Sequence, residues 1–213
     1  MSITDKFIVI GLVGAVGSGR KTVANILSSI DPGFCKCSFA DFIWAEAINA
    51  FGVSSDLFTN SNLESRKDPA LAIVRCGDVE FIERMTALSY NLIEFRTPAE
   101  ILHLWGTEYR RNQDPEYWAE QLSAFIHEKI KSGIRRFVVP DLQFIDDIEL
   151  IIKMRGEVWL IRREDQSSSV DEWDSVEYAG GFVDRIIRND RDEFSLTAQV
   201  IGIYSEIADE EAF

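Results

Sequence analysis

The sequence of 213 residues has few of the residues that build metal centres and disulfide frameworks. Its three cysteines, Cys35, Cys37 and Cys76, are odd in number and form no CxxC pair, so neither a disulfide scaffold nor a zinc knuckle is predicted. Its two histidines, His103 and His127, are too few and too far apart to indicate by themselves a zinc site or a catalytic triad. We therefore expect the cysteines to be buried thiols.

The chain also lacks long apolar runs and an excess of positive charge. No apolar run is long enough to cross a bilayer, and residues 1–6 show no secretion-signal pattern, which predicts an intracellular, cytoplasmic protein. Lys and Arg number 22 against 36 Asp and Glu, and the net charge of -14 disfavours passive binding to nucleic acid or to an anionic membrane, so we expect neither partner. A nucleotide needs only a local positive pocket, so a nucleotide-binding enzyme stays open.

The apolar content is ample for one domain, or for one core that carries a helical insertion, since apolar residues make up 46% of the chain and aromatic residues 11%. Strands are predicted at residues 7–10, 34–39, 134–141, 158–161 and 186–190. Helices are predicted at residues 22–27, 40–51, 97–105, 115–132, 143–154 and 194–207. Because strands and helices alternate, we expect an α/β fold with a mainly parallel sheet and covering helices.

The most informative stretch is residues 7–22, FIVIGLVGAVGSGRKT. An apolar β-branched run that ends in glycines suits a buried strand, and a helix pattern follows it. A helix N-terminus behind a glycine-rich turn is a phosphate site. Gly14 and Gly19 match the spacing of the motif GxxxxGK[ST], but Arg20 occupies the Lys position and is followed by Lys21 and Thr22. The alternative interpretation is a turn that binds nothing.

Charged residues follow several of the predicted strands. Asp41 comes after the second strand, where it either faces a substrate or caps the next helix. Asp141 ends a later strand, where it either organises a magnesium shell or caps the next helix. Arg162 and Arg163 follow the next strand, on the side where ligands bind in open α/β sheets. Lys67 belongs to a basic pair that is either a solvated surface or a phosphate contact.

Three further segments carry specific expectations. The sequence TPAE at residues 97–100 predicts a helix start with a capping box, and Gly106 is expected to interrupt the helix that follows. Residues 70–93 are mostly helical in period, with a break near Gly77. Residues 165–174 are polar and serine-rich, which indicates a mobile loop or lid.

Several segments, in their order along the chain, resemble the P-loop deoxynucleoside monophosphate kinases that are found especially in bacteriophages. The resemblance covers most of the chain, and WGTE after a TP-initiated helix is its most specific element. The segments are the glycine loop, SFAD at residues 38–41, ESRKDP at 64–69, TPAEILHLWGTEYRR at 97–111, VVPDLQF at 138–144, LIRR at 160–163 and DRIIRND at 184–190.

The resemblance implies a P-loop NTPase-like, three-layer α/β fold that spans residues 1–213 as one domain, with a helical substrate-binding insertion at about residues 41–132. It implies transfer of the γ-phosphoryl group of ATP to a deoxynucleoside 5'-monophosphate, with Mg²⁺, to give the diphosphate. The partner would be this small-molecule substrate. The chain could also form a homodimer, and a phage-encoded protein would work in the host cytoplasm.

The resemblance also assigns roles to single residues. ATP would be held by Gly14, Ala15, Gly17, Ser18, Gly19, Arg20, Lys21, Thr22 and Asn189, of which Asn189 would lie near the base or brace the loop below it. The monophosphate and its pocket would involve Asp41, Lys67, Trp105, Thr107, Glu108, Arg110 and Arg111. Thr22 and Asp141 would bind magnesium. Catalysis would depend on Arg20, Lys21, Asp41, Asp141 and Arg162.

The chain differs from the family at several positions, some of which would touch phosphate. This chain has Arg20 where the family usually has a Lys, and Ala99 where it commonly has an Arg. It has His103 where a Gln is expected and Gln143 where an Arg is expected. Loss of one charge-assisted contact to phosphate costs about 1.5 to 3 kcal/mol. Three functions therefore stay open: an active deoxynucleoside monophosphate kinase, a kinase-fold protein that binds nucleotide as a sensor, inhibitor or assembly partner, and a small-molecule kinase of another P-loop family.

Overall fold

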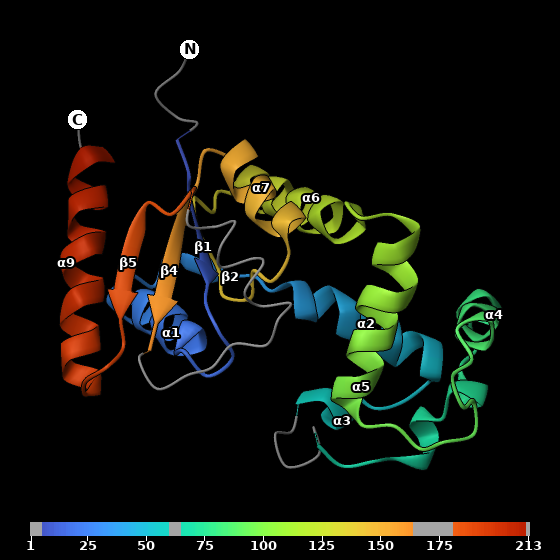
Figure 1. The fold of residues 1–213 in the computed structure, drawn as a ribbon. Coiled ribbons are helices and arrows are strands. Elements are labelled where there is room, and N and C mark those ends of the chain that lie inside the picture. Colours follow the sequence, from blue (N-terminus) through green and yellow to red (C-terminus); the bar gives the residue numbers. More distant parts are fainter. Residues whose placement is uncertain (1–5, 60–64, 164–180, 212–213) are drawn as a thin grey trace. The chain divides into compact units, whose positions relative to one another are not determined.

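The computed structural model describes residues 6–59, 65–163 and 181–211 (Figure 1). The chain forms two compact units, a sheet unit made of Met1–Phe39 and Leu122–Phe213 and a helical unit made of Ala40–Gln121. It enters the helical unit within helix α2 (Phe39–Phe51) and leaves it within helix α6 (Tyr117–Lys131). The segment 165–174, expected to form a mobile loop or lid, lies outside the described residues.

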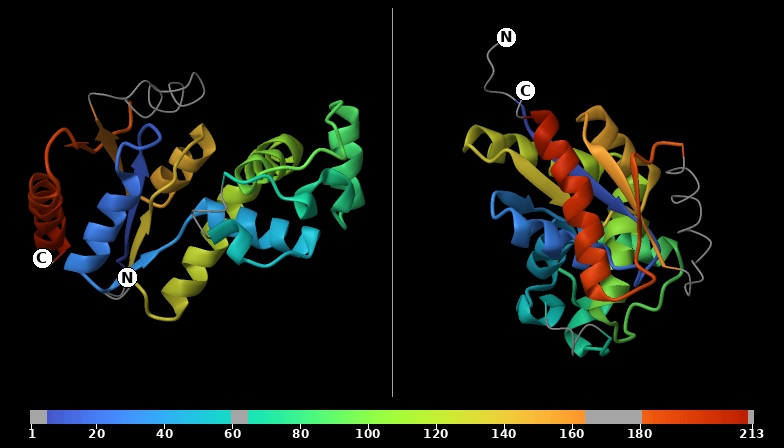
Figure 2. Two further views of the ribbon diagram at one scale, coloured as in Figure 1. Left: turned by 90° about the horizontal axis from the view of Figure 1, so that it is seen from below. Right: turned by 90° about the vertical axis from the view of Figure 1, so that its left-hand side faces the viewer.

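The sheet unit is built on five parallel strands in the order β2-β3-β1-β4-β5 (Figures 1 and 2). In register, Ile8 of the central strand lies opposite Arg136, and Ile10 lies opposite Glu157. The central strand is buried along its whole length, as its apolar sequence predicts. The strands are β1 (Ile8–Val13), β2 (Phe34–Lys36), β3 (Arg136–Val139), β4 (Glu157–Arg162) and β5 (Arg185–Arg188).

One face of the sheet packs against α1 (Arg20–Ile30) and α9 (Glu193–Glu211). Alternate side chains of a strand point to the same face, so Ile8, Ile10 and Leu12 of β1 enter this layer together. The apolar side of α1 meets them because its buried residues recur at helical spacing. The helix residues of this core include Val23, Ala24, Ile26 and Leu27 of α1 and Leu196, Val200, Tyr204 and Ile207 of α9.

The opposite face of the sheet contacts α7 (Ile145–Lys153). At Gly11 a Cβ atom would lie only 2.6 Å from Leu142 Cδ1 and 2.8 Å from Ile151 Cγ1. Gly11 lies inside β1, so the predicted strand end at Ile10 is wrong: this glycine makes room for packing and does not start the turn. Helices on both faces give three layers, and the predicted α/β fold with a parallel sheet is confirmed.

The helical unit connects α2 to α6 by short helices (Figure 1). Within residues 70–93, which were predicted to be mostly helical, only α4 is an α-helix. Its N-cap is Asp78, whose carboxylate accepts a hydrogen bond from Phe81 N at 2.9 Å. The residue before the cap, Gly77, donates its N–H to Ala50 O at 2.7 Å, so this amide is bound outside the helix. The short helices are α3 (Asp56–Thr59), η1 (Pro69–Leu71), η2 (Ile73–Arg75), α4 (Val79–Ala87), α5 (Pro98–His103) and η3 (Leu104–Arg111).

The start of α5 is the predicted capping box. Thr97 Oγ1 accepts a hydrogen bond from Glu100 N at 3.1 Å, and Glu100 Oε2 accepts one from Thr97 N at 2.7 Å. The predicted interruption at Gly106 is wrong, because the helix continues through it as the π-helix η3. A Cβ atom at Gly106 would lie 2.9 Å from Ile43 Cδ1, and the Gly106 carbonyl accepts a bond from Trp118 Nε1 at 2.9 Å.

Aromatic rings form much of the core of the helical unit. The centroid of the Phe81 ring lies 4.9 Å from that of Trp105, 5.6 Å from Tyr109 and 6.0 Å from Phe51. Such pairs contribute about 0.5 to 1.5 kcal/mol each beyond the burial of their surface. The core therefore fixes η3 against α4 and α2. Within the described residues of both units, no helix combines the length and the apolar character needed to cross a bilayer.

Candidate functional site

The glycine loop, residues 14–19, joins β1 to α1 at the carboxyl edge of the sheet. Gly19, the residue before α1, has a φ of 107°, which side chains rarely adopt, and a Cβ there would lie 2.4 Å from Asn189 Nδ2. Gly14 approaches the neighbouring strand, where a Cβ would lie 2.4 Å from the Ile161 carbonyl oxygen. The loop in this position needs glycine at both ends.

The end of β5 braces this loop. Asn189 Nδ2 donates to the Ser18 carbonyl at 2.8 Å, and Asn189 N donates to the Arg162 carbonyl at 2.8 Å, so one residue ties the loop to the end of β4. The Ser18 hydroxyl is buried and has no hydrogen-bond partner among the described residues. A buried hydroxyl without a partner is costly in a finished core, and it is expected where a ligand completes the site.

The first turn of α1 offers backbone N–H groups to a ligand. The residue before it, Gly19, has no side chain to cap the helix, and the first turn contains no acidic residue. The first N–H groups of a helix have no partner within the helix, and the helix dipole makes this end positive. This helix start therefore suits an anion, as the sequence predicts for a phosphate site.

The two basic residues at this helix start differ in their surroundings. Arg20 is half-buried, and its Nη1 donates to the Leu142 carbonyl at 3.1 Å, in the loop that follows β3. Lys21 is exposed and forms no hydrogen bond or ion pair within the described part of the chain. Lys21 is therefore the cation that can move toward a ligand, whereas Arg20 is held toward the β3 side of the loop.

Asp141 links the end of β3 to the start of α2. Its Oδ2 accepts a hydrogen bond from Ser38 Oγ at 2.5 Å, and its Oδ1 accepts one from Phe39 N at 3.2 Å. The amides that precede α7 bind a different acid: Phe144 N lies 2.9 Å from an oxygen of Asp147, which is buried. Asp147 thus supplies the cap of α7 that was the alternative interpretation of Asp141. Asp141 is instead held in place beside the start of α2.

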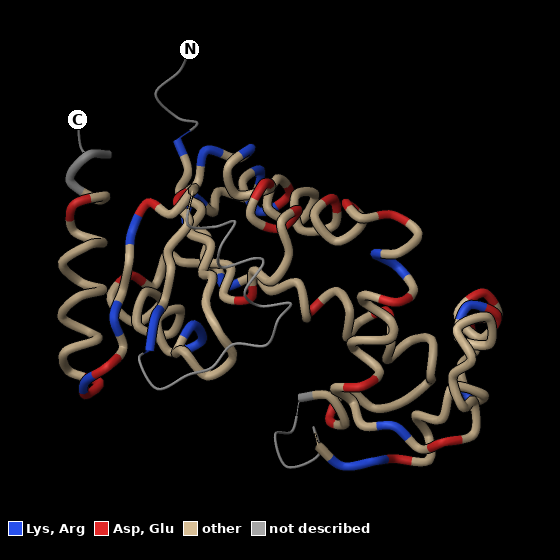
Figure 3. The backbone as a smooth tube through the Cα atoms, viewed as in Figure 1, with Lys and Arg blue, Asp and Glu red and all other residues tan. Residues whose placement is uncertain are grey.

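Arginines gather where β4 and β5 end, as the blue segments of Figure 3 show. Arg162, the last residue of β4, pairs in register with Arg188, the last residue of β5. These two side chains and that of Arg163 are exposed, and none forms an ion pair with a described residue. Uncompensated charges of one sign attract an ion of the other sign. Because all strands are parallel, this arginine cluster lies at the same edge of the sheet as the glycine loop.

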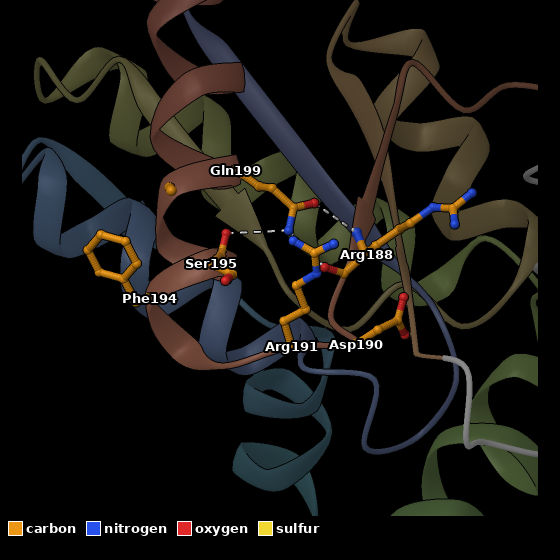
Figure 4. A pocket seen from close by; sticks show the side chains of 7 residues that line it. Arg188, Asp190, Arg191, Phe194, Ser195 and Gln199 are labelled. Atoms are coloured by element: carbon orange, nitrogen blue, oxygen red, sulfur yellow. Dashed lines mark hydrogen bonds between the residues drawn. The ribbon is translucent and has the colours of Figure 1, made fainter.

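A cavity of about 660 Å³ lies beside the end of β5 (Figure 4). Gln199 of α9 donates to the Arg188 carbonyl at 2.9 Å and accepts from Arg188 N at 3.2 Å, so its amide occupies the outer edge of β5 as a further strand would. The cavity shares Arg188 with the arginine cluster. It is lined by Arg188, Asp190, Arg191, Phe194, Ser195, Ala198 and Gln199.

The helical unit contains a cavity of its own, of about 340 Å³, which we call the Glu46 pocket. Glu46 Oε2 accepts hydrogen bonds from Trp105 Nε1 and Arg110 Nε, both at 2.9 Å, and its Oε1 accepts one from Tyr117 OH at 2.5 Å. The carboxylate thus joins η3 to α6 and to its own helix, α2. The pocket is lined by Glu46, Asn49, Ala50, Gly77, Asp78, Trp105 and Arg110.

Two tyrosines keep their protons beside this pocket. Burial, together with the neighbouring Asp78 carboxylate and against the opposing charge of Arg110, raises the pKa of Tyr109 to about 12. Burial and the bond to Glu46 also raise the pKa of Tyr117. At neutral pH both hydroxyls therefore donate, Tyr109 OH to Asp78 Oδ1 at 3.2 Å and Tyr117 OH to Glu46.

Of the substrate-binding residues predicted in the helical unit, Trp105 and Arg110 lie together in the Glu46 pocket. Others are engaged elsewhere. Lys67 is exposed and forms an ion pair with Glu94 at 2.7 Å. Arg111 Nη1 donates to the Pro115 carbonyl at 3.4 Å, and the carboxylate of Glu108 lies 3.7 Å from His103 Nε2. Thr107 is half-buried in η3, and Asp41 is exposed in the first turn of α2.

Sequence reasoning missed Glu46, Asn49 and Asp78, which line the Glu46 pocket. Asp78 carried a usable signal, because an Asp directly before a helical pattern predicts an N-cap. Glu46 carried no signal in the sequence, because its hydrogen-bond partners lie 59, 64 and 71 residues further along the chain. Ser38, which orients Asp141, was equally invisible for the same reason.

Comparison with known proteins supports the fold. No protein-family model matches the chain, and no curated protein sequence matches it. Among solved structures, the dephospho-CoA kinase from Campylobacter jejuni matches with a TM-score of 0.50 and 17% identity, over 93% of this chain and 96% of that one. A shikimate kinase from Bacteroides thetaiotaomicron matches with a TM-score of 0.44 and 12% identity, over 95% of this chain and 99% of that one.

The strand order, the glycine loop between β1 and α1, and the likeness to the first of these structures agree with one another. The chain therefore has a P-loop kinase fold. The likeness concerns the fold alone, and the phage-type deoxynucleoside monophosphate kinase family stays a prediction from the sequence.

Proposed function

We propose that the chain is an ATP-dependent deoxynucleoside monophosphate kinase. In this reaction the bond between the γ-phosphorus and the bridging β,γ-oxygen of ATP breaks, and a phosphate oxygen of the monophosphate bonds to that phosphorus, which gives ADP and a deoxynucleoside diphosphate. The observation that supports the proposal best is the start of α1, where uncapped amides follow a glycine loop. The partner-less hydroxyl of Ser18 in that loop supports a ligand there as well.

Phosphoryl transfer depends mainly on positioning and on neutralising charge. The loop from Gly14 to Thr22 would cradle the phosphates of ATP with its backbone amides. Lys21 would reach them as a mobile cation, and Arg20 would act from its place beside Leu142. Arg162, with the other arginines at the ends of β4 and β5, would hold the transferred group from the same edge of the sheet.

Thr22 and Asp141 would hold magnesium, which when bound neutralises charge on the β- and γ-phosphates. A hydroxyl and a carboxylate are the hard oxygen ligands that this ion prefers, and Ser38 and Phe39 N already orient Asp141. Within the described residues no group of three His, Cys, Asp or Glu side chains is placed to hold a metal. That fits a magnesium ion bound through one or two side chains together with phosphate oxygens and water.

The acceptor nucleotide would use the helical unit, where Trp105 and Arg110 share the Glu46 pocket. Pockets that hold small molecules combine apolar walls with a few fixed polar groups, and this pocket has an indole, a guanidinium, an amide and two carboxylates. The homodimer and the cytoplasmic location expected from the sequence stay predictions.

A second function, nucleotide binding without efficient phosphoryl transfer, is favoured by the surroundings of Arg20 and by two uncharged residues. Arg20 is engaged by the Leu142 carbonyl, and Ala99 and Gln143 bring no charge to positions where the family has arginine. A protein with these changes could bind nucleotide without transferring phosphate efficiently and act as a sensor, inhibitor or assembly partner. Each lost charged contact to phosphate weakens binding of the transition state by about 1.5 to 3 kcal/mol.

A coupled assay for ADP release tests both functions. Full-length protein is supplied with ATP, magnesium and each of the four deoxynucleoside monophosphates, and we expect turnover with at least one. Asp141→Ala should lose at least about a hundredfold in rate, whereas Asp56→Ala, an exposed acid in α3, should keep it. The melting temperature of each variant shows whether it is folded.

Three results decide against the deoxynucleoside monophosphate kinase. Nucleotide binding by calorimetry without turnover for any monophosphate supports the binding protein. If neither ATP nor ADP binds, both functions are wrong. If another phosphate acceptor is turned over while the monophosphates neither react nor raise the melting temperature, the chain is a small-molecule kinase of another P-loop family.

A further inference from the structure

The Glu46 pocket contains an arginine that is fixed before any ligand arrives. Arg110 Nε is bound to Glu46, and the guanidinium carbon lies 4.6 Å from the ring centre of Tyr109, 5.2 Å from Tyr117 and 5.5 Å from Trp105. Its Nη1 and Nη2 form no hydrogen bond within the described part of the chain. The guanidinium is therefore a rigid plane whose outer N–H groups remain to be used.

A carboxylate with spare capacity shares the pocket. Asp78 accepts hydrogen bonds from Phe81 N and from Tyr109 OH. An ionised carboxylate has about four acceptor positions, so at least one is left for a donor in the pocket. The raised pKa of Tyr109 keeps its proton in place, so its hydroxyl remains a donor to Asp78 at neutral pH.

The charge of the lining decides what kind of group enters. Glu46 and Asp78 bring two negative charges and Arg110 brings one positive charge, so the pocket carries a net negative charge. A phosphate group would be repelled there. The volume of about 340 Å³ lies at the low end of ligand pockets, which suits one ring system better than a whole nucleotide.

We infer that the Glu46 pocket binds the base of the acceptor nucleotide and prefers guanine, an assignment that rests on the proposed kinase function. Guanine presents two adjacent acceptors, O6 and N7, which suit the two outer N–H groups of an arginine. Its N1–H and 2-amino group are donors, which suit a carboxylate such as Asp78. Trp105, whose indole N–H is bound to Glu46, also lines the pocket.

The other three bases match less of this lining. The amino donor of adenine lies between its acceptors N1 and N7, so a pair of neighbouring groups that faces Arg110 would include that donor. Cytosine has the neighbouring acceptors O2 and N3, but it offers Asp78 one donor group, its 4-amino group, where guanine offers two. Thymine has a methyl group beside its O4 acceptor and lacks an amino group for Asp78. Asn49 can donate and accept, and so does not discriminate among the bases.

Calorimetry on the full-length protein with dGMP, dAMP, dCMP and dTMP tests the assignment. We expect dGMP to bind at least about tenfold more tightly than dTMP, because one well-placed pair of hydrogen bonds discriminates by about this factor or more. Asp78→Asn and Arg110→Lys should each reduce the ratio of dGMP to dTMP affinity about tenfold. Asn remains a good N-cap, so Asp78→Asn keeps the start of α4.

Matched controls are Asp56→Asn in α3 and Arg75→Lys in η2, which lie outside the pocket and should leave the ratio unchanged. The base assignment is overturned if dTMP binds as tightly as dGMP, or if both pocket variants weaken all four nucleotides equally. If the monophosphates are turned over at equal efficiency, only the base assignment fails. If none of the four binds and none is turned over, the proposed function fails with it.

Discussion

Replacing Glu46 should lower the free energy of unfolding of the helical unit. Its carboxylate is the shared acceptor of Trp105 and Arg110, both of η3, and of Tyr117 at the start of α6. We compare two variants. Glu46→Ala removes the acceptor altogether, whereas Glu46→Gln keeps the shape and one acceptor oxygen but removes the charge.

The magnitude follows from the contacts. Trp105 is 1% exposed, so Glu46→Ala leaves its indole N–H buried without an acceptor, which costs about 1 to 3 kcal/mol. The bonds to Arg110 and Tyr117 add less, because the side chains of Arg110 and Glu46 are 23% and 27% exposed and water screens them. We expect a loss of about 3 kcal/mol in the free energy of unfolding for Glu46→Ala and about 1 to 2 kcal/mol for Glu46→Gln.

Urea unfolding followed by circular dichroism and tryptophan fluorescence measures both losses. The control is Glu83→Gln, an exposed glutamate of α4, which should change the free energy of unfolding by less than about 0.5 kcal/mol. The reasoning is refuted if Glu46→Gln lies within 0.5 kcal/mol of the wild type, or if Glu46→Ala is no worse than Glu46→Gln.

Two further predictions concern the sheet unit. Burial opposes the charged form of Asp31, but hydrogen bonds from Tyr204 and Gly33 and the charge of Arg136 lower its pKa. The charged form therefore stabilises the fold above the usual pKa of about 4, and this stability is lost as the pH falls through the lowered pKa. We expect Asp31→Asn to lower the free energy of unfolding by about 1 kcal/mol at pH 7. In urea titrations this loss should shrink below pH 4. A deficit that is constant between pH 7 and pH 2.5 would contradict this. Gly19→Ala should lose about 1 to 3 kcal/mol in the same titration and weaken the rise in melting temperature with ATP, because a Cβ at φ 107° would meet Asn189. Gly202→Ala in α9, with open space around it, should be neutral or stabilising, and equal effects of the two substitutions would count against the loop geometry.

The sequence by itself determined the local features of this protein. The capping box at Thr97 and Glu100 uses groups three residues apart, and the strand, glycine turn and helix of residues 7–22 are one continuous stretch. The alternation of strands and helices then predicted the parallel α/β sheet. Such signals depend on neighbours along the chain, so they can be read without knowing what packs against them.

Only the tertiary structure decided the roles of residues whose partners are distant in the sequence. Gly11 lies within a strand and Gly106 within a π-helix, and at both positions a Cβ atom would meet packed side chains, of Leu142 and Ile151 or of Ile43. Asn189 braces a loop that is 171 residues away, and Glu46 collects donors from two other helices. The side chain alone fits several roles at each of these positions, and the contacts made by folding select one.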